Sequence, residues 1–347
     1  MIRIIKIFSL QLCIALTFSL TLYAQQPDPP GQVTEGEAVN TAYLFAHMTH
    51  KDYGHLYYSV SLDGLHWQML NDGDRVYDAY RGHPDICKGH DGRYYLMGNK
   101  NDSSPDINIW VSDDLCTWEP FSIFTPDLQK TPGYEEALPR IGAPKIFYDK
   151  DSETYVITWH TPHLWGTDGD PERYWASQRT LYVTSKDLKT FSDVPHKLFE
   201  WNMGTIDVII RKIEDTYYAI LKDERYPTLE WVTGKTIRIS SSDNLLGPYS
   251  YPTGPISPNF REAPMLIPSP DANAWYLYYE QYPGVSYGLS VSRNINGPWF
   301  QVSGYTFFMD WDKYSLPQKV RHGCMLTITS EEYTKIVTKF GIAEEKE

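Results

Sequence analysis

Two interleaved series of sequence repeats constrain the fold of this chain more than any other feature. The first is a Ser-x-Asp or Ser-x-Asn block after a short apolar segment, with copies at Ser61, Ser112, Ser185, Ser241 and Ser292. The second joins a small or turn-forming start, an apolar segment, a polar turn and an aromatic-rich segment, with copies starting at His83, Gly142, Thr205, Glu262 and Arg321. Most copies recur about every 50–60 residues, the length of a four-stranded propeller blade.

Each period therefore contains a hairpin with a polar turn (HDG, KDSET or IED), a third strand, and a Ser-x-Asp turn leading to a fourth. The pattern predicts an all-β chain folded as a five-bladed β-propeller with four-stranded blades. We expect residues 42–48 to share one blade with the segment from Arg321, because that closure removes open strand edges. A β-sandwich is the alternative, and five copies of two series argue against it. The Ser and Asp side chains should cap turns, and the aromatic residue ending each block should pack between blades.

The first residues of the chain resemble a secretory signal peptide. Arg3 and Lys6 precede a mostly apolar stretch over residues 7–22 that is short for a membrane span, and Ala24 is a small residue at a plausible cleavage position. We predict a signal peptide at 1–24, a flexible segment at 25–39 and a single catalytic domain at 40–347. The expected location is therefore secreted or periplasmic.

Charge and aromatic content narrow the class of partner. The formal net charge is −13, which argues against binding to nucleic acid or to an anionic membrane surface. Aromatic residues make up 15% of the chain, and the apolar faces of Tyr and Trp suit sugar surfaces. We expect a neutral oligo- or polysaccharide partner, no nucleic acid, no membrane insertion and a monomeric protein.

Titratable residues recur where the innermost strand begins in four of the five blades, the exception being the blade that starts at Gly142. These strand starts converge on the axis of a propeller. The residues concerned are His83 and Asp85, then Asp207, then Arg261 and Glu262, and finally Arg321 and His322. Glycoside hydrolysis uses two carboxyl groups in unlike surroundings, one protonated beside the leaving oxygen and one ionised beside water. The sequence therefore predicts Asp85, Asp207 and Glu262 as catalytic residues.

A longer insertion, WHTPHLWGTDGDPERYW, follows the apolar segment of the second blade. Its aromatic and imidazole side chains are expected to form a sugar platform at the mouth, and we assign His160 and Trp165 to substrate binding together with His83, Arg261, Arg321 and His322. His160 and His163 are also a candidate metal pair, but no third ligand is indicated and no metal site is predicted.

At these residues the chain resembles glycoside hydrolase family 43 over nearly all of its length after the signal. TIDVIIRKIEDTYYAILKDE is similar to the family's context for an Asp that tunes the acid, and REAPMLIP is similar to the context of the general acid. The resemblance implies a five-bladed propeller, inversion at the anomeric carbon and Glu262 as the acid. It implies Asp207 as the tuning residue, which we expect to raise the pKa of Glu262 through repulsion between like charges and so to keep it protonated. It also implies no required cofactor, although a structural Ca2+ at the propeller axis, near His322, is compatible with it.

The chain departs from the family at the general base, which lies in an Asp-Pro pair there. His83-Pro84 stands at this place, and the nearest carboxylate is Asp85, two residues on. Three interpretations stay open: Asp85 is the base, His83 holds the water, or the base comes from elsewhere.

The function expected from the sequence is an exo-acting, inverting glycosidase that removes terminal galactose, arabinofuranose or xylose from plant-type polysaccharide or oligosaccharide. A glycan-binding propeller without activity is one alternative, favoured by His83 at the place of the base. A sialidase-like hydrolase is another, suggested by SLDGLHW, although the acidic charge argues against an anionic sugar.

Overall fold

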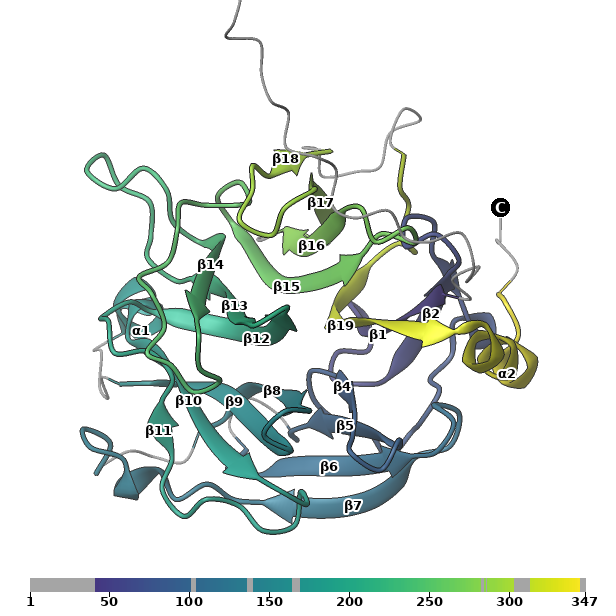
Figure 1. Cartoon of the computed structure of the whole chain (residues 1–347), viewed down its shortest axis with the longest axis horizontal. Coiled ribbons are helices and arrows are strands. Elements are labelled where there is room, and N and C mark those ends of the chain that lie inside the picture. Colours follow the sequence, from purple (N-terminus) through teal and green to yellow (C-terminus); the bar gives the residue numbers. More distant parts are fainter. Residues whose placement is uncertain are drawn as a thin grey trace, which may run out of the picture. The chain divides into compact units, whose positions relative to one another are not determined.

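A computed structural model describes residues 41–100, 104–135, 140–163, 169–281, 284, 286–302 and 313–343. These residues form five antiparallel sheets arranged around a common centre (Figure 1). Each sheet is one blade, and the innermost strands are β4, β8, β12, β15 and β19, as the second repeat series predicts. The five-bladed propeller is therefore confirmed. The proposed signal peptide at 1–24 and the segment 25–39 lie outside the described residues.

The strands follow one another outward from the centre in each blade. The first blade contains β4 (Asp85–Lys88), β5 (Tyr94–Gly98), β6 (Ile107–Ser112) and β7 (Glu119–Phe124). The second contains β8 (Gly142–Asp149), β9 (Thr154–Pro162), β10 (Gln178–Ser185) and β11 (His196–Lys197). The third contains β12 (Thr205–Ile213), β13 (Thr216–Asp223) and β14 (Thr236–Ser242). The fourth contains β15 (Arg261–Pro268), β16 (Trp275–Gln281), β17 (Tyr287–Ser292) and β18 (Phe300–Gln301).

The closing blade joins segments from distant parts of the chain, as predicted. Its order is β19 (Val320–Thr329), β1 (Thr41–Thr49), β2 (Tyr57–Ser61) and β3 (Gln68–Met69). Strand β1 pairs along its whole length with β19 and also pairs with β2. Both edges of β1 are thus covered, and the ring has no open edge at the seam.

The third blade is the irregular one, because its outer position holds no regular strand. The backbone N–H groups of Ser250, Thr253 and Ile256 donate to carbonyls of β14 at 2.8–2.9 Å. Pro252 and Pro255 interrupt this segment, and proline has no N–H to contribute to a ladder. The segment therefore fills the place of a fourth strand without forming one.

The Ser-x-Asp blocks are turn caps, as expected. The Asp63 carboxylate accepts the backbone N–H groups of Leu65 and His66 at 2.8 Å, while Ser61 donates to Asp63. The blocks at Ser112 and Ser185 repeat this arrangement, and in the third blade Ser242 takes the place predicted for Ser241.

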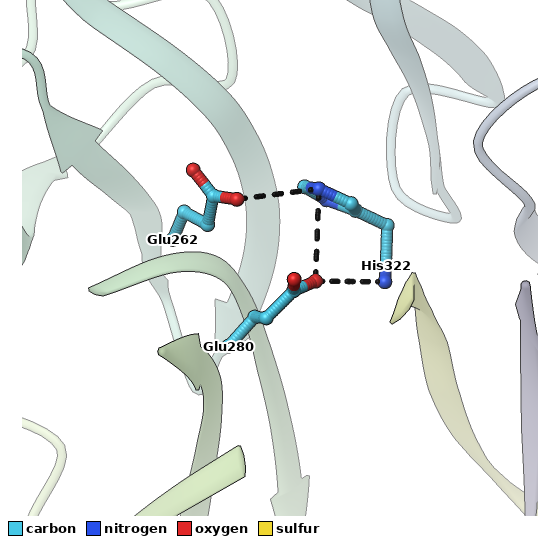
Figure 2. Close-up of side chains that lie close together, drawn as sticks. All are labelled: Glu262, Glu280 and His322. Atoms are coloured by element: carbon cyan, nitrogen blue, oxygen red, sulfur yellow. Dashed lines mark hydrogen bonds and ion pairs between the residues drawn. The ribbon is translucent and has the colours of Figure 1, made fainter. Parts of the chain in front are cut away.

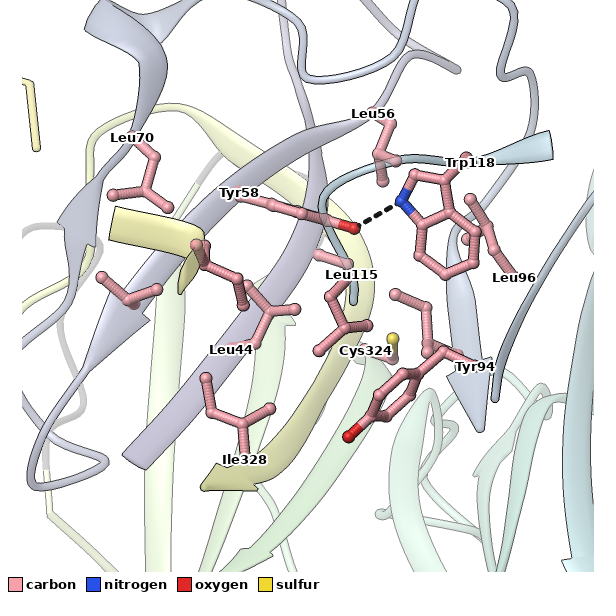
Figure 3. Close-up of a cluster of buried hydrophobic side chains, with 14 of the residues drawn as sticks. Leu44, Leu56, Tyr58, Leu70, Tyr94, Leu96, Leu115, Trp118, Cys324 and Ile328 are labelled. Carbon is pink, nitrogen blue, oxygen red and sulfur yellow. Dashed lines mark hydrogen bonds between the residues drawn. The ribbon is translucent and has the colours of Figure 1, made fainter. Parts of the chain in front are cut away.

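Aromatic residues at the ends of these blocks pack between blades. Trp118 of the first blade lies against the closing blade, where its indole N–H donates to the Tyr58 hydroxyl at 2.8 Å within a cluster that also contains Leu44 and Leu56 (Figure 3). Trp67 of the closing blade lies edge-on to Tyr278 of the fourth blade. These contacts join neighbouring blades through buried apolar surface.

The end of the chain differs from the prediction. The second repeat series predicts a strand after the polar turn at residues 329–332, but helix α2 (Ser330–Phe340) stands there. Thr329 and Glu332 form a reciprocal capping box, which satisfies the first free N–H groups of a helix. A strand is also unnecessary at this point, because β1 already pairs with β19. The remaining helices are short: α1 (Pro171–Ala176) and 3-10 turns at Asn71–Gly73 and Leu128–Lys130.

Bulges at the axial ends of the inner strands aim side chains toward the centre. Register shifts interrupt β8, β12 and β15 after Gly142, Ile206 and Glu262 respectively. Asp207 and Ala263, the first residues of two of these bulges, have positive φ angles of 53° and 48°. Bulges of this kind re-aim side chains and are frequent beside active sites. No helix among the described residues is long and apolar enough to span a bilayer.

Candidate active site

Four of the predicted site residues meet where the inner strands begin. His322 Nε2 lies 3.4 Å from Glu262 Oε1, and Arg321 Nη2 lies 3.9 Å from the same oxygen. The His83 ring stacks on the His322 ring with centroids 4.8 Å apart. Residues from β15, β19 and the start of the first blade therefore form one cluster.

Glu280 completes this cluster, although the sequence analysis did not single it out. Its Oε2 accepts the backbone N–H of His322 at 3.0 Å and lies 3.6 Å from His322 Nε2 (Figure 2). Its other oxygen forms an ion pair with Arg321. The Glu280 side chain is fully buried, and the imidazole of His322 thus lies between two carboxylates.

Lys222 is the second residue that the sequence analysis missed. Its ammonium lies 2.8 Å from Glu262 Oε2 and 2.7 Å from Glu224 Oε1, with the side chain 3% exposed. Glu224 also contacts Lys235, whose ammonium lies 3.5 Å from Glu172. Lys235, Glu224 and Lys222 thus form a buried row of alternating charges that ends on Glu262.

These neighbours set the charge states of the cluster. Burial opposes ionisation of Glu262, but the Lys222 ammonium and His322 hold its pKa well below the ordinary range. Burial also opposes protonation of His322, but Glu280 and Glu262 raise its pKa to about 9. Burial and the neighbouring Glu262 raise the pKa of Glu280. The prediction that repulsion by Asp207 keeps Glu262 protonated is wrong, because the Lys222 ammonium 2.8 Å away lowers the pKa of Glu262.

His83 faces the mouth beside Tyr53, another residue that the sequence analysis did not identify. The Tyr53 hydroxyl lies 2.8 Å from His83 Nε2, and its ring stands edge-on to both His83 and His322. Burial and the neighbouring His322 hold the pKa of His83 well below its usual value, so the imidazole is neutral. A neutral imidazole can accept a proton.

Asp85 and Asp207 occupy equivalent structural roles between blades. Asp85 Oδ2 accepts the backbone N–H of Ile146 in the second blade at 2.7 Å, and Asp85 Oδ1 lies 3.7 Å from Lys145 Nζ. Asp207 Oδ2 accepts the backbone N–H of Ala263 in the fourth blade at 3.1 Å. Burial raises the pKa of Asp85. The Asp207 contact fixes the residue that follows Glu262.

The structure also places three other residues that the sequence singles out: His160, Arg261 and His163. His160 packs over Gly142, where a Cβ would lie 2.2 Å from its Nε2. The Arg261 guanidinium donates to the carbonyls of Asn259 and Phe260 at 2.9 and 3.1 Å, a structural arrangement. His163 packs against Tyr134 instead of pairing with His160. Trp165 lies outside the described residues.

Strand register shows how the missed residues could have been found. Gly142 pairs with His160, Ile206 with Lys222 and Glu262 with Glu280, each immediately before a bulge. The second strand of each of these blades therefore also ends near the axis. Each carries a titratable residue there: His160 on β9, Lys222 on β13 and Glu280 on β16. Comparing only the strand starts overlooked this position.

The cluster does not fit the structural Ca2+ considered above. Glu262, Glu280 and His322 place ligand atoms within 4.8 Å of one another. However, Lys222 and Arg321 already form ion pairs with the two carboxylates. Ca2+ takes six to eight oxygen ligands, and this group presents two carboxylates beside cations.

A five-bladed propeller with buried carboxylates of opposed environment at its axis is an architecture of glycoside hydrolases. A family model described as a probable glycosyl hydrolase domain, related to glycoside hydrolase family 43, matches residues 39–334, and the chain belongs to this family. A search among curated proteins gives no match.

Solved structures share the fold at low sequence identity. A family 43 arabinoxylan arabinofuranohydrolase from Bacillus subtilis is 14% identical, with a TM-score of 0.55 over 78% of this chain and 65% of that chain. An α-L-arabinofuranosidase from Lactobacillus brevis is 15% identical, with a TM-score of 0.50 over 64% of this chain and 72% of that chain. An exo-β-1,3-galactanase from Phanerochaete chrysosporium is 16% identical, with a TM-score of 0.47; the match covers 63% of this chain and about half, 49%, of that one.

Proposed function

We propose that this protein is a secreted or periplasmic, exo-acting glycoside hydrolase that releases terminal galactose, arabinofuranose or xylose from a neutral oligo- or polysaccharide. The observation that carries the proposal is the axial arrangement of Glu262, His322 and Glu280 in a chain that belongs to a glycosyl hydrolase family. The net charge of −13 favours a neutral sugar. Buried titratable groups with opposed pKa shifts are typical of acid–base sites.

The leaving group receives its proton through Glu262. His322 is protonated at neutral pH and lies 3.4 Å from Glu262 Oε1. Closure of the site by a sugar excludes water, and a proton then passes from His322 Nε2 to Glu262 and from Glu262 to the glycosidic oxygen. The bond between that oxygen and the anomeric carbon breaks, and the electron pair stays with the oxygen.

The attacking water is held by His83. Its neutral imidazole takes one proton from the water as the oxygen bonds to the anomeric carbon from the opposite face, which inverts the configuration. Loss of the proton from His322 removes a positive charge 4.8 Å from the His83 ring, measured between ring centroids. The pKa of His83 therefore rises as the leaving group is protonated. At the end of these two steps His83 carries a proton and His322 is neutral.

Asp85 and Asp207 position these groups. The bond from Ala263 N–H to Asp207 keeps the bulge that aims Glu262 inward. The bond from Ile146 N–H to Asp85 ties the first blade to the second. In this proposal Asp85 is not the base; Lys145 and the backbone amide already surround its carboxylate.

Substitution of Glu262 tests the proposal on a panel of aryl galactosides, arabinofuranosides and xylosides. Glu262→Gln keeps the shape but cannot relay a proton, so kcat should fall by about 10²–10⁴ for poor leaving groups. The fall should be much smaller for activated aryl glycosides, which leave without protonation. Glu331→Gln, on the exposed first turn of α2, is the matched control and should change nothing. Equal losses for all leaving groups would contradict the role of Glu262.

A glycan-binding propeller without activity is the second candidate, favoured by a histidine where the family has an aspartate. It predicts that the wild-type protein binds a neutral glycan in calorimetry and cleaves no member of the panel. Release of any monosaccharide, detected by chromatography, excludes it.

A further inference from the structure

The loop between β13 and β14 carries a group of exposed apolar side chains beside the candidate active site. The side chains of Tyr226, Leu229, Trp231 and Val232 are 49%, 94%, 37% and 68% exposed. We call these four residues the loop platform. Isolated exposed apolar residues are normal, but several on one short loop mark a surface for a ligand or a partner.

The loop that bears the platform is held in a defined shape. Lys235 N–H donates to the Arg225 carbonyl at 2.9 Å, which closes the base of the loop. The Arg225 guanidinium binds the buried Asp223 and lies 3.9 Å above the Trp231 ring. Thr228 accepts the Trp231 N–H at 3.0 Å. The aromatic rings are therefore pre-positioned, so that little conformational entropy is lost when they bind a ligand.

The platform is continuous with the active site through two connections. Lys222, at the end of β13, contacts Glu262, and the loop follows directly. Tyr226 packs edge-on to Phe260 with ring centroids 5.9 Å apart, and Phe260 precedes Glu262 by two residues. Asn259 ties the end of this loop to the segment before β15. Its side-chain amide donates to the Val232 carbonyl, and its side-chain oxygen accepts the Gly234 N–H. The loop thus lies beside the start of β15, the strand that carries Glu262.

We propose that the loop platform binds the sugars of a neutral polysaccharide chain beyond the bond that is cleaved. This rests on the proposed function and extends it from the terminal sugar to the sugars that follow it along the polysaccharide. Tyr226 and the part of Trp231 that Arg225 leaves exposed offer rigid apolar surface to the C–H faces of sugars and a polar edge to their hydroxyls. A net charge of −13 disfavours anionic lipid or anionic polymer as the occupant. Continuity with the site that holds the scissile bond favours the substrate over an unrelated partner.

Kinetics on two substrate sizes test this assignment. Trp231→Ala and Tyr226→Ala should each lower kcat/KM on neutral arabinan, galactan or arabinoxylan on the order of tenfold, which corresponds to about 1.4 kcal/mol of lost contact. On an aryl monoglycoside, which does not reach the loop, both variants should stay within twofold of wild type. Trp231→Phe should recover most of the loss. Phe300→Ala, which removes an exposed aromatic on β18, is the matched control.

Polysaccharide binding is measured separately by electrophoretic retardation in gels that contain the same three polymers. Retardation of wild type, lost in both alanine variants and kept in Phe300→Ala, supports the platform even if no glycoside is hydrolysed, which would refute only the proposed function. Unchanged kinetics and retardation in both alanine variants would overturn the inference. Binding of wild type to neutral phosphatidylcholine vesicles, abolished by Tyr226→Ala, would overturn it in favour of a membrane surface. Concentration-dependent dimerisation abolished by that substitution would overturn it in favour of a second copy.

Discussion

At the scale of single residues, Lys222 controls the charge of Glu262. The two groups are 2.8 Å apart and almost completely buried, where a missing charge is poorly replaced by water. Removing the ammonium should raise the pKa of Glu262, because the carboxylate loses its nearest cation. Glu262 should then hold the proton that it shares with His322 more tightly. Two other cations still face Glu262: the protonated His322 at 3.4 Å and Arg321 at 3.9 Å.

Lys222→Met should therefore shift the pH profile of kcat/KM. The alkaline limb reports loss of the proton shared by His322 and Glu262, and it should move upward from the region of pH 9. Lys222→Arg keeps the charge and should leave the profile near that of wild type. A Met variant with lower activity but an unmoved profile would show that Lys222 is only structural.

Substituting His83 and Asp85 separately tests which of the two residues accepts the proton of the attacking water. His83→Ala removes the group proposed to accept the proton of water, so turnover should fall by about 10²–10⁴ for every leaving group alike. Asp85→Asn keeps an oxygen for the Ile146 N–H and should retain most activity. Steady-state rates on good and poor leaving groups measure both. If Asp85→Asn is inactive and His83→Ala is not, Asp85 is the base.

At the scale of elements, the repeats predict most strands because each blade uses the same residue types at the same places. A polar turn, a buried run and a Ser-x-Asp cap have local physical causes, so five copies can be read from the sequence alone. Helix α2 escaped this reasoning, since its capping box occupies the place of a repeat turn. The sequence pattern looked like another hairpin, and only the presence of β1 beside β19 removes the need for one.

The site was only partly predictable for a related reason. Glu262, His322, Arg321 and His83 stand at strand starts, where the repeat alignment places them on the axis. Lys222 and Glu280 stand at strand ends, and their position depends on bulges that shift the register before each of them. Their influence on Glu262 then depends on distances of a few ångströms, which no spacing in the sequence encodes. The direction of the Glu262 pKa shift was wrong for this reason.

At the scale of the whole molecule, the pairing of β1 with β19 is the seam that closes the ring of five blades. The seam is tight at Gly323, where a Cβ would lie 2.0 Å from the Ala46 carbonyl oxygen and 2.9 Å from the His47 Cα. Backbone atoms cannot move aside as a flexible side chain can. A methyl group at this position must therefore push β1 away from β19.

Gly323→Ala should lower the free energy of unfolding by about 1–3 kcal/mol, the usual cost of overpacking a buried site. Denaturant titration followed by tryptophan fluorescence measures the shift of the midpoint. Gly254→Ala is the matched control, since no atom lies within 4 Å of its added Cβ, and its midpoint should stay within error of wild type. Because the seam lies within the closing blade, opening it leaves every inter-blade interface intact except those on either side of that blade. A second, earlier transition in Gly323→Ala would show that the seam yields first, whereas an unchanged midpoint would mean that ring closure does not limit stability.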